Sequence, residues 1–245
     1  MSGHNKWSTI KRKKGANDAK RSKMFSKIIK EITVAVKEGG ADPDSNPRLR
    51  MAITNAKGVS MPKDNIQRAI SKGKDKDSAN FSEVSYEGYA PHGIAVFVEC
   101  TTDNLQRTIA NVRAAFNKHN GSLGKNGSLT FLFDRKAIFT LNAVDVNEEF
   151  ELEMIDAGAE DYDIDEGVIT ITTGFEDFGN MMSKLEELKI EPTSAELQRI
   201  PNTTEKISVD AARSVLKMID VLEDDDDVIN VFHNLDIPEE LLNEM

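Results

Sequence analysis

The residues best suited to chemistry in this sequence are the cations near its N-terminus. Residues 1–78 hold 19 Lys and Arg against 8 Asp and Glu, whereas the remaining residues carry a net charge of −22 and bring the 245-residue chain to −11. A cationic segment concentrates phosphate-bearing partners, and an anionic body keeps the molecule off non-specific sites. The pattern predicts that residues 1–78 bind nucleic acid by neutralising backbone phosphates.

The predicted contacts are the basic and aromatic side chains of this segment. They are Lys6, Trp7, Lys11, Arg12, Lys13, Lys14, Lys20, Arg21, Lys23, Lys27, Lys30, Arg48, Arg50, Lys63 and Arg68. Trp7 could stack on an unpaired base or anchor the N-terminal arm onto the helices that follow. In the most basic helix only Arg21 offers a guanidinium for bidentate contact with guanine, so we expect recognition of backbone or shape rather than of base sequence.

Two acidic or glycine-rich motifs resemble ligand-binding loops but fail at required positions. The stretch GSLGKNGS at 121–128 lacks the glycine and the hydroxyl residue of a P-loop, because those positions hold His119 and Asn126. It predicts a flexible turn that carries Lys125. The stretch DYDIDEG at 161–167 lacks the glycine and the glutamate of a calcium loop, so we expect a strand whose Tyr162 and Ile164 face inward. The acidic run 224–227 predicts a solvated turn.

Catalysis finds no support in the spacing of reactive side chains. The four histidines are far apart in the sequence, none has metal-ligand spacing to Cys100, and no nucleophile motif is present. We therefore expect no enzymatic activity, no metal and no cofactor. Cys100 lies in the apolar run 94–100 and is expected to be a small buried hydrophobic residue.

Hydropathy and cysteine usage indicate a cytoplasmic protein with no membrane partner. No uncharged apolar run approaches the length of a membrane span, and the first residues contain no apolar signal region. A single cysteine excludes an intramolecular disulfide and suits a reducing compartment.

Helices alone are predicted up to residue 78. Apolar residues recur at helical spacing over 18–38, and Gly39-Gly40 supplies the stop. Ser45-Asn46-Pro47 begins a second helix and Met61-Pro62 a third, while 71–80 has the composition of a linker.

Strands alternate with helices beyond residue 80. We predict strands at 81–89, 94–100, 128–133, 137–141, 160–165, 168–173, 195–200 and 228–235, and helices at 103–119, 146–157, 175–188 and 209–222. The helix at 103–119 is expected to be capped by Thr102 or Asp103. The elements from 137 to 200 follow the βαββαβ order of a ferredoxin-like unit.

The resulting fold class is α+β with three domains. Residues 1–78 form an all-α, basic nucleic-acid-binding domain; residues 79–134 plus 207–245 form a discontinuous α/β domain; and residues 135–206 form an α/β domain inserted into it. Both α/β domains are predicted to be ferredoxin-like.

Several ordered motifs carry a resemblance to a known family. They are GHNKWSTIKRKKGANDAKRSKMFSKIIKEI (3–32), DPDSNPRLRMAI (42–53), MPKDNIQRAI (61–70), YEGYAPHG (86–93), TDNLQRT (102–108), NGSLGKNGSLTFLFDRK (120–136) and VLEDDDDVINVFHNLDI (221–237). On these residues the chain resembles the YebC/PmpR family. It departs from the family pattern at Ala90 and His92, where glycine is frequent, and at Ser60, where asparagine is common.

The resemblance implies a helical N-terminal domain, two α/β domains and a regulatory function. The leading expectation is a DNA-binding transcriptional regulator, and the alternative is a ribosome-associated translation factor that binds ribosomal RNA. The acidic α/β domains are expected to position the protein or to contact a protein partner. Because the chain begins with methionine at the first family motif, we expect no transit peptide and a bacterial form of the family.

Overall fold

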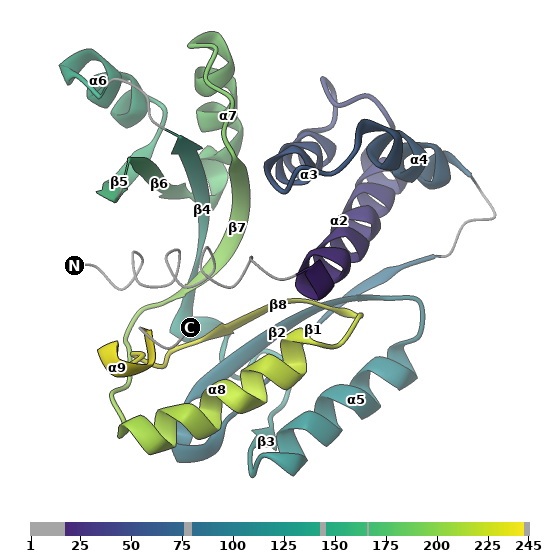
Figure 1. The fold of residues 1–245 in the computed structure, drawn as a ribbon, viewed down its shortest axis with the longest axis vertical. Coiled ribbons are helices and arrows are strands. Elements are labelled where there is room, and N and C mark those ends of the chain that lie inside the picture. The colour runs from purple at the N-terminus through teal and green to yellow at the C-terminus, as the bar shows by residue number, and fades with distance from the viewer. Residues whose placement is uncertain (1–17, 76–79, 143–145, 166, 243–245) are drawn as a thin grey trace. The chain divides into compact units, whose positions relative to one another are not determined.

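The structure, a computed structural model, describes residues 18–75, 80–142, 146–165 and 167–242, with side chains from Ser22 onward. Three helices come first, as predicted: α2 (Asp18–Gly39), α3 (Pro47–Gly58) and α4 (Lys63–Lys74) (Figure 1). Gly40 has φ +86°, a left-handed conformation that glycine adopts readily and that ends α2.

Asn46 joins the end of α2 to the start of α3. Its side-chain oxygen accepts a hydrogen bond from the Leu49 amide at 3.0 Å, and its side-chain nitrogen donates to the carbonyls of Ala35 and Gly40 at 2.7 and 2.8 Å. A buried amide with all three bonds made fixes the turn between the helices. The Asn46-Pro47 start signal is therefore confirmed.

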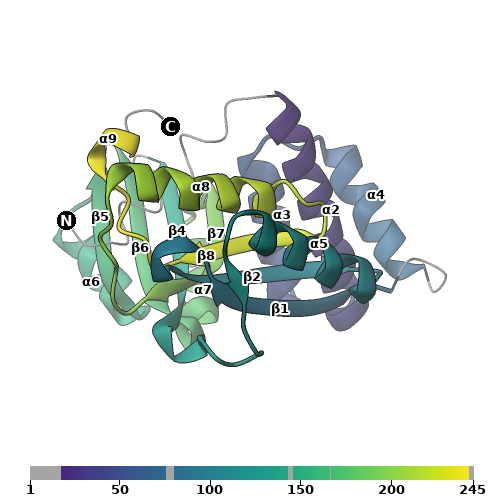
Figure 2. The same ribbon diagram turned by 90° about the horizontal axis from the view of Figure 1, so that it is seen from below.

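The first sheet has the strand order β3-β1-β2-β8. Its strands are β1 (Ser82–Tyr89), β2 (Ala95–Thr102), β3 (Ser122–Leu123) and β8 (Val228–His233). Helices α5 (Leu105–Lys118) and α8 (Val209–Glu223) cover one face, as Figure 2 shows, and bury a core that includes Val98, Phe116 and Met218. The N-cap of α5 is Asn104, not Thr102 or Asp103, because its side chain accepts from the Arg107 amide. A short helix, α9 (Glu239–Leu242), follows β8.

The opposite face of this sheet is covered by an irregular segment. The predicted strand at 128–133 is wrong, because residues 128–132 form a turn and the 3-10 helix η3 (Thr130–Leu132), and a strand begins only at Phe133. Leu129 and Phe133 are buried four residues apart against Phe97 and Phe232, whereas Phe131 between them is exposed. Burial at that spacing follows a helical turn rather than the two-residue period of a strand.

The second sheet has the order β5-β6-β4-β7. It contains β4 (Phe133–Asn142), β5 (Ala159–Asp165), β6 (Val168–Gly174) and β7 (Ser194–Pro201), with helices α6 (Glu148–Asp156) and α7 (Phe178–Glu187), the latter preceded by the 3-10 helix η4 (Phe175–Asp177). Phe139, Ile171 and Met181 lie in the core between sheet and helices. The element order is βαββαβ, as the sequence pattern predicts.

The first sheet has a different element order. Its first two strands are neighbours joined by the short 3-10 helix η2 (Pro91–Gly93), so the order is ββαβ followed, after the second sheet, by αβ. The sequence predicts two successive strands before the helix at 103–119, as observed, but this order is not βαββαβ, so the ferredoxin-like class predicted for this domain is wrong. The tight connection needs left-handed backbone at His92 (φ +65°) and Gly93 (φ +79°). His92 and Ser60 (φ +58°) are two of the departures from the family pattern, and both have a left-handed backbone conformation.

Contacts group the chain into two compact units. The first unit contains Met1–Lys27, Ala79–Asp134 and Arg199–Met245, and the second contains Ile28–Ser78 and Arg135–Gln198. In the second unit α3 closes one edge of the sheet, because the Asn55 side chain donates to the Ala195 carbonyl and accepts from the Ala195 amide, both at 2.9 Å. The predicted boundaries of three domains stay a prediction.

Candidate nucleic-acid interface

The N-terminal part of the predicted interface falls largely outside the described residues. Lys6, Trp7, Lys11, Arg12, Lys13 and Lys14 lie there. Lys20 and Arg21 belong to the first turns of α2, and their side chains are also outside the described part. The contacts predicted for these eight residues stay predictions.

Two cations on α2 contact the acidic turn that follows α8. Lys23 Nζ lies 2.7 Å from Asp224 Oδ1, and one helical turn later Lys27 Nζ donates to the Glu223 carbonyl at 2.9 Å. The carboxyl end of a helix attracts cations because its last carbonyls are unpaired. Lys30, farther along α2, is half-buried. Lys23 and Lys27 therefore already have anionic or carbonyl partners within the protein.

The two arginines of α3 are bonded within the second unit. Arg48 Nη1 lies 2.5 Å from Glu38 Oε2. Arg50 donates to the carbonyls of Pro43 at 3.1 Å and Asp44 at 2.9 Å, and its third nitrogen lies 3.3 Å from Glu186. A guanidinium divided among three acceptors holds the loop before α3 in place. Arg50 thus has a structural role that the sequence pattern did not reveal.

Helix α4 exposes a row of cations to solvent. Lys63 is exposed, and Arg68 is exposed while donating to the Asp64 carbonyl and the Asn65 side chain. Lys72 and Lys74 are also exposed, although the sequence reading placed them in a linker. Within the described part of the chain, none of these three lysines forms an ion pair.

Gly73 explains why α4 extends into the expected linker as far as Lys74. A Cβ at this position would lie 2.6 Å from the Cβ of Val36, so only glycine allows the last turn of α4 to pack against α2. A run of glycine and polar residues predicts the end of a helix. Only the tertiary contact between Gly73 and Val36 shows that the helix continues. The signal available in the sequence was that Gly73 continues the helical spacing of the buried positions Ile66, Ala69 and Ile70.

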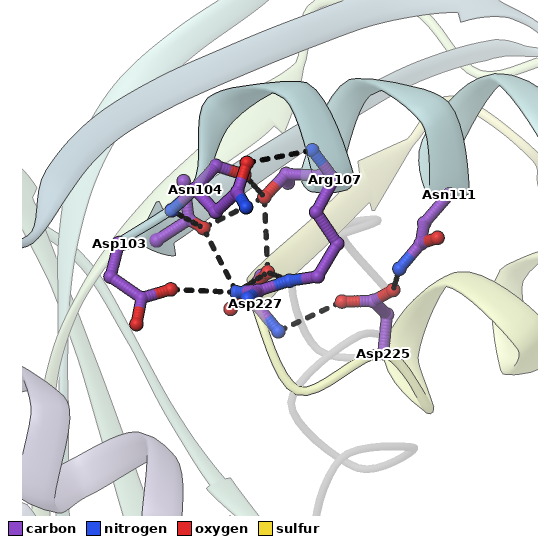
Figure 3. Close-up of polar contacts among 8 residues, drawn as sticks. Asp103, Asn104, Arg107, Asn111, Asp225 and Asp227 are labelled. Carbon is purple, nitrogen blue, oxygen red and sulfur yellow. Dashed lines mark hydrogen bonds and ion pairs between the residues drawn. The ribbon is translucent and has the colours of Figure 1, made fainter.

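A buried carboxylate organises the turn between α8 and β8. Asp227 Oδ2 accepts hydrogen bonds from Arg107 Nη2 at 2.7 Å, Arg107 Nε at 3.1 Å and Thr108 Oγ1 at 3.0 Å (Figure 3). Arg107 also forms an ion pair with Asp103. The hydrogen bond to Asp227, and to a smaller extent the one to Asp103, raises the pKa of the guanidinium. The predicted solvated turn is therefore wrong at Asp227, which is buried.

A second buried carboxylate holds the glycine-rich turn. Glu87 on β1 accepts hydrogen bonds from the amides of Gly127 at 2.7 Å and Leu129 at 2.5 Å, and its carbonyl accepts from Gly124 at 2.7 Å. Gly127 has φ +83°. The turn that exposes Lys125 is therefore pinned to the sheet at three points, which the prediction of a flexible turn did not anticipate.

Cys100 is buried on β2 and is suited to packing rather than chemistry. Burial, followed by the negative charges of Asp225 and Asp227, raises the pKa of its thiol to about 12. A thiol with so high a pKa is protonated at neutral pH and is a poor nucleophile. In the described part of the chain no group of three or more His, Cys, Asp and Glu could hold a metal ion, and no helix there could cross a membrane.

Comparisons with known proteins identify the family. A model of the TACO1/YebC protein N-terminal domain matches residues 5–76, and a model of the TACO1/YebC second and third domain matches residues 81–235. A probable transcriptional regulatory protein of Amoebophilus asiaticus is 56% identical over 239 residues, or 96% of this chain and 98% of that protein. One of Geotalea uraniireducens is 51% identical over the whole of both chains.

A solved structure supports the same conclusion. The crystal structure of a conserved hypothetical protein, Aq1575, of Aquifex aeolicus matches with a TM-score of 0.80 and 45% sequence identity, and covers 92% of this chain and 94% of that one. The chain therefore belongs to the TACO1/YebC family.

Proposed function

We propose that this protein is a nucleic-acid-binding regulator, with duplex DNA as its leading partner and transcription as the process it regulates. The observation that carries the proposal is the separation of charge, with 19 cations among residues 1–78 of an otherwise strongly acidic chain. The names of the A. asiaticus and G. uraniireducens relatives, probable transcriptional regulatory proteins, support the choice of DNA.

The contacts within the protein favour phosphate recognition over base reading. Arg48 and Arg50 are bonded to protein acceptors, whereas Lys63, Lys72 and Lys74 on α4 point into solvent. Lysine acts as a point charge and reads no base pattern, while bidentate guanine recognition requires a free guanidinium. We infer that the exposed lysines of residues 1–78 contact backbone phosphates rather than base edges.

Structured ribosomal RNA is the second candidate partner. The observation that favours it is the same shortage of free arginines on α3 and α4, because a regulator of specific promoters must read bases. A backbone-following surface suits an RNA whose shape supplies the specificity. On this alternative the protein is a translation factor that acts on the ribosome.

We also propose the nested domain organisation, with residues 79–134 and 207–245 forming one discontinuous domain and residues 135–206 inserted in it. Its support is the pairing of β8 with β2 in the first sheet. All four strands of the second sheet lie between these two strands in the sequence. The helical residues 1–78 would form the third domain.

The test is a salt titration of binding to duplex DNA and to structured ribosomal RNA by the full-length protein. If about six phosphates are neutralised, log K should fall with log salt at a slope near −5 on duplex DNA. Replacing Lys63, Lys72 and Lys74 by glutamine should reduce that slope by about 2 to 3. The matched control replaces Lys118, Lys125 and Lys217, three exposed lysines outside residues 1–78, and should leave the slope almost unchanged.

A binding selection on random DNA separates the two partners. No consensus, with strong competition by the RNA, supports the ribosomal alternative, whereas a sharp consensus supports a promoter-specific regulator and contradicts backbone recognition. Equal losses in the α4 variant and its control would contradict the proposed interface.

A further inference from the structure

Four large apolar side chains are exposed on two neighbouring elements of the second unit. Leu152 and Ile155 on α6 are 63% and 60% exposed, and Tyr162 and Ile164 on β5 are 37% and 51% exposed. The Tyr162 hydroxyl donates to Glu151, next to Leu152, so the two elements are in contact. We call these four residues the α6–β5 face; α6 lies beside β5 at one end of the sheet (Figure 1).

The α6 part of this face is directed away from the core. Leu152 and Ile155 are three residues apart and share one side of the helix, whereas Phe150 and Met154, four apart, are buried on the other. On β5, Tyr162 and Ile164 pair in register with Ile171 and Ile169 of the core, yet they stay exposed. The prediction that they face inward is correct for the side of the sheet and wrong for their burial.

The cause of this exposure is that β5 lies at the edge of the sheet. Its one partner among the described strands is β6, so every second residue directs its N–H and C=O away from the sheet. The opposite edge differs, because Asn55 of α3 bonds both backbone groups of Ala195 on β7. Within the described residues β5 therefore presents an open edge beside apolar side chains.

The segment that forms the face is acidic throughout. Residues 148–165 contain nine Asp and Glu and no Lys or Arg. Lys184 pairs with Glu153 and Lys136 with Glu160. Asp161 and Asp163 on β5 have no ion pair in the described part of the chain, and both project to the face of the strand opposite Tyr162 and Ile164.

We propose that the α6–β5 face binds an extended peptide segment of a partner protein, rich in Lys or Arg alternating with apolar residues, which adds to β5 as a fifth strand. The open edge supplies the backbone hydrogen bonds. Because side chains of an added strand alternate as those of β5 do, its apolar residues meet Tyr162 and Ile164 while its cations meet Asp161 and Asp163.

A second copy of this chain does not fit the same edge. Pairing β5 with another β5 would place carboxylates opposite carboxylates, and like charges directly across a strand pair are destabilising. Acidic residues on an edge strand exclude most strands from pairing. The carboxylates that prevent self-association therefore select a basic partner.

The test measures binding of labelled eight-residue peptides to the full-length protein by fluorescence anisotropy. The probes are a peptide of alternating Lys and Val, one of alternating Lys and Ser, and one of alternating Glu and Val. We expect the Lys–Val peptide to bind about tenfold more tightly than the Lys–Ser peptide, since each added apolar cross-strand pair contributes. The Glu–Val peptide should not bind.

Two double variants locate the site. Replacing Ile155 and Ile164 by serine should weaken Lys–Val binding about five- to tenfold, whereas replacing the exposed Leu188 and Val221 by serine should not. Hydrogen exchange should show new protection of the β5 amides when the Lys–Val peptide is bound. Unchanged circular dichroism and nucleic-acid binding of both variants would show that they are folded.

Three outcomes would overturn the proposal. Equal affinity for the Lys–Val and Lys–Ser peptides would mean that the peptides bind through non-specific electrostatic attraction alone. Protection confined to α6 would indicate a helical partner instead of an added strand. A concentration-dependent dimer in sedimentation experiments that the Ile155 and Ile164 variant abolishes would identify a second copy as the occupant.

Discussion

Carboxylates lie in opposite environments on the two sheets. In the first sheet Glu87 and Asp227 are 2% and 3% exposed, and each accepts hydrogen bonds from several donors. In the second sheet Asp161 on β5 is exposed and Asp163 is half-buried, and both alternate with exposed apolar side chains. Burial of a charged group is costly unless donors replace its water, whereas an exposed charge costs the fold almost nothing. The first pair therefore holds loops in place, and the second pair is free to select a partner.

The largest effect is expected from Asp227→Ala. It removes the acceptor of three hydrogen bonds from Arg107 and Thr108 and should destabilise the first unit by about 3 kcal/mol. Hydrogen exchange of the β2 and β8 amides measures this, because a chain with two units need not unfold in one step. The control is Asp103→Asn, which removes an exposed partner of the same Arg107 and should cost less than about 0.5 kcal/mol. Similar losses for both variants would contradict the comparison.

Glu87→Gln is expected to have the next largest effect. The amide of glutamine retains one oxygen as an acceptor, so one of the two amides of Gly127 and Leu129 loses its partner, at a cost of about 2 kcal/mol. Faster hydrogen exchange at these two amides, with little change in the helices, would localise the loss to the turn. The matched control on the same strand is Glu83→Gln, for which we expect a smaller loss because this carboxylate is exposed.

Much of the fold could be predicted from local sequence. The Asn46-Pro47 start of α3, the Gly39-Gly40 stop of α2 and the acidic hairpin of β5 and β6 are encoded in a few neighbouring residues. The segment 128–133 could not, because its alternating residues mimic a strand. A contact distant in sequence holds it instead: Glu87, about forty residues earlier in the chain, accepts hydrogen bonds from the amides of Gly127 and Leu129.

The candidate interface, too, could be predicted only in part from the sequence. The sequence locates the cations, because charge is a local property. It does not reveal their partners: Arg50 bends back to the carbonyls of Pro43 and Asp44 and reaches Glu186, and Lys23 meets Asp224 from the far end of the chain. Lys72 and Lys74 were missed because the packing of Gly73 against Val36, which extends α4, is a tertiary contact.

The acidic turn of the first unit also affects how stability depends on pH, through Cys100. Burial and the nearby Asp225 and Asp227 raise the pKa of its thiol from 9.0 to about 12. The folded state holds the thiol proton more tightly than the unfolded state. The stability that this proton contributes is therefore complete below pH 9 and is lost as the pH rises toward 12. The free energy of unfolding should fall by about 1 kcal/mol between pH 9 and pH 10 from this group. The variant Cys100→Ala should lack that part of the decline, and parallel curves for the two proteins would show that the thiol does not contribute.

The smallest change in stability is expected from replacing both Asp161 and Asp163 by asparagine. Asp161 is exposed, Asp163 is half-buried, and neither has an ion pair in the described part of the chain, so the free energy of unfolding should stay within about 0.5 kcal/mol of its original value. Their removal should instead change association, because an open edge strand without charge becomes able to pair with another copy. Sedimentation at increasing protein concentration should therefore detect self-association in the double variant and not in the original protein. A loss of stability above about 1 kcal/mol would place these carboxylates with Asp227 as structural groups, and the contrast between the two sheets would fail.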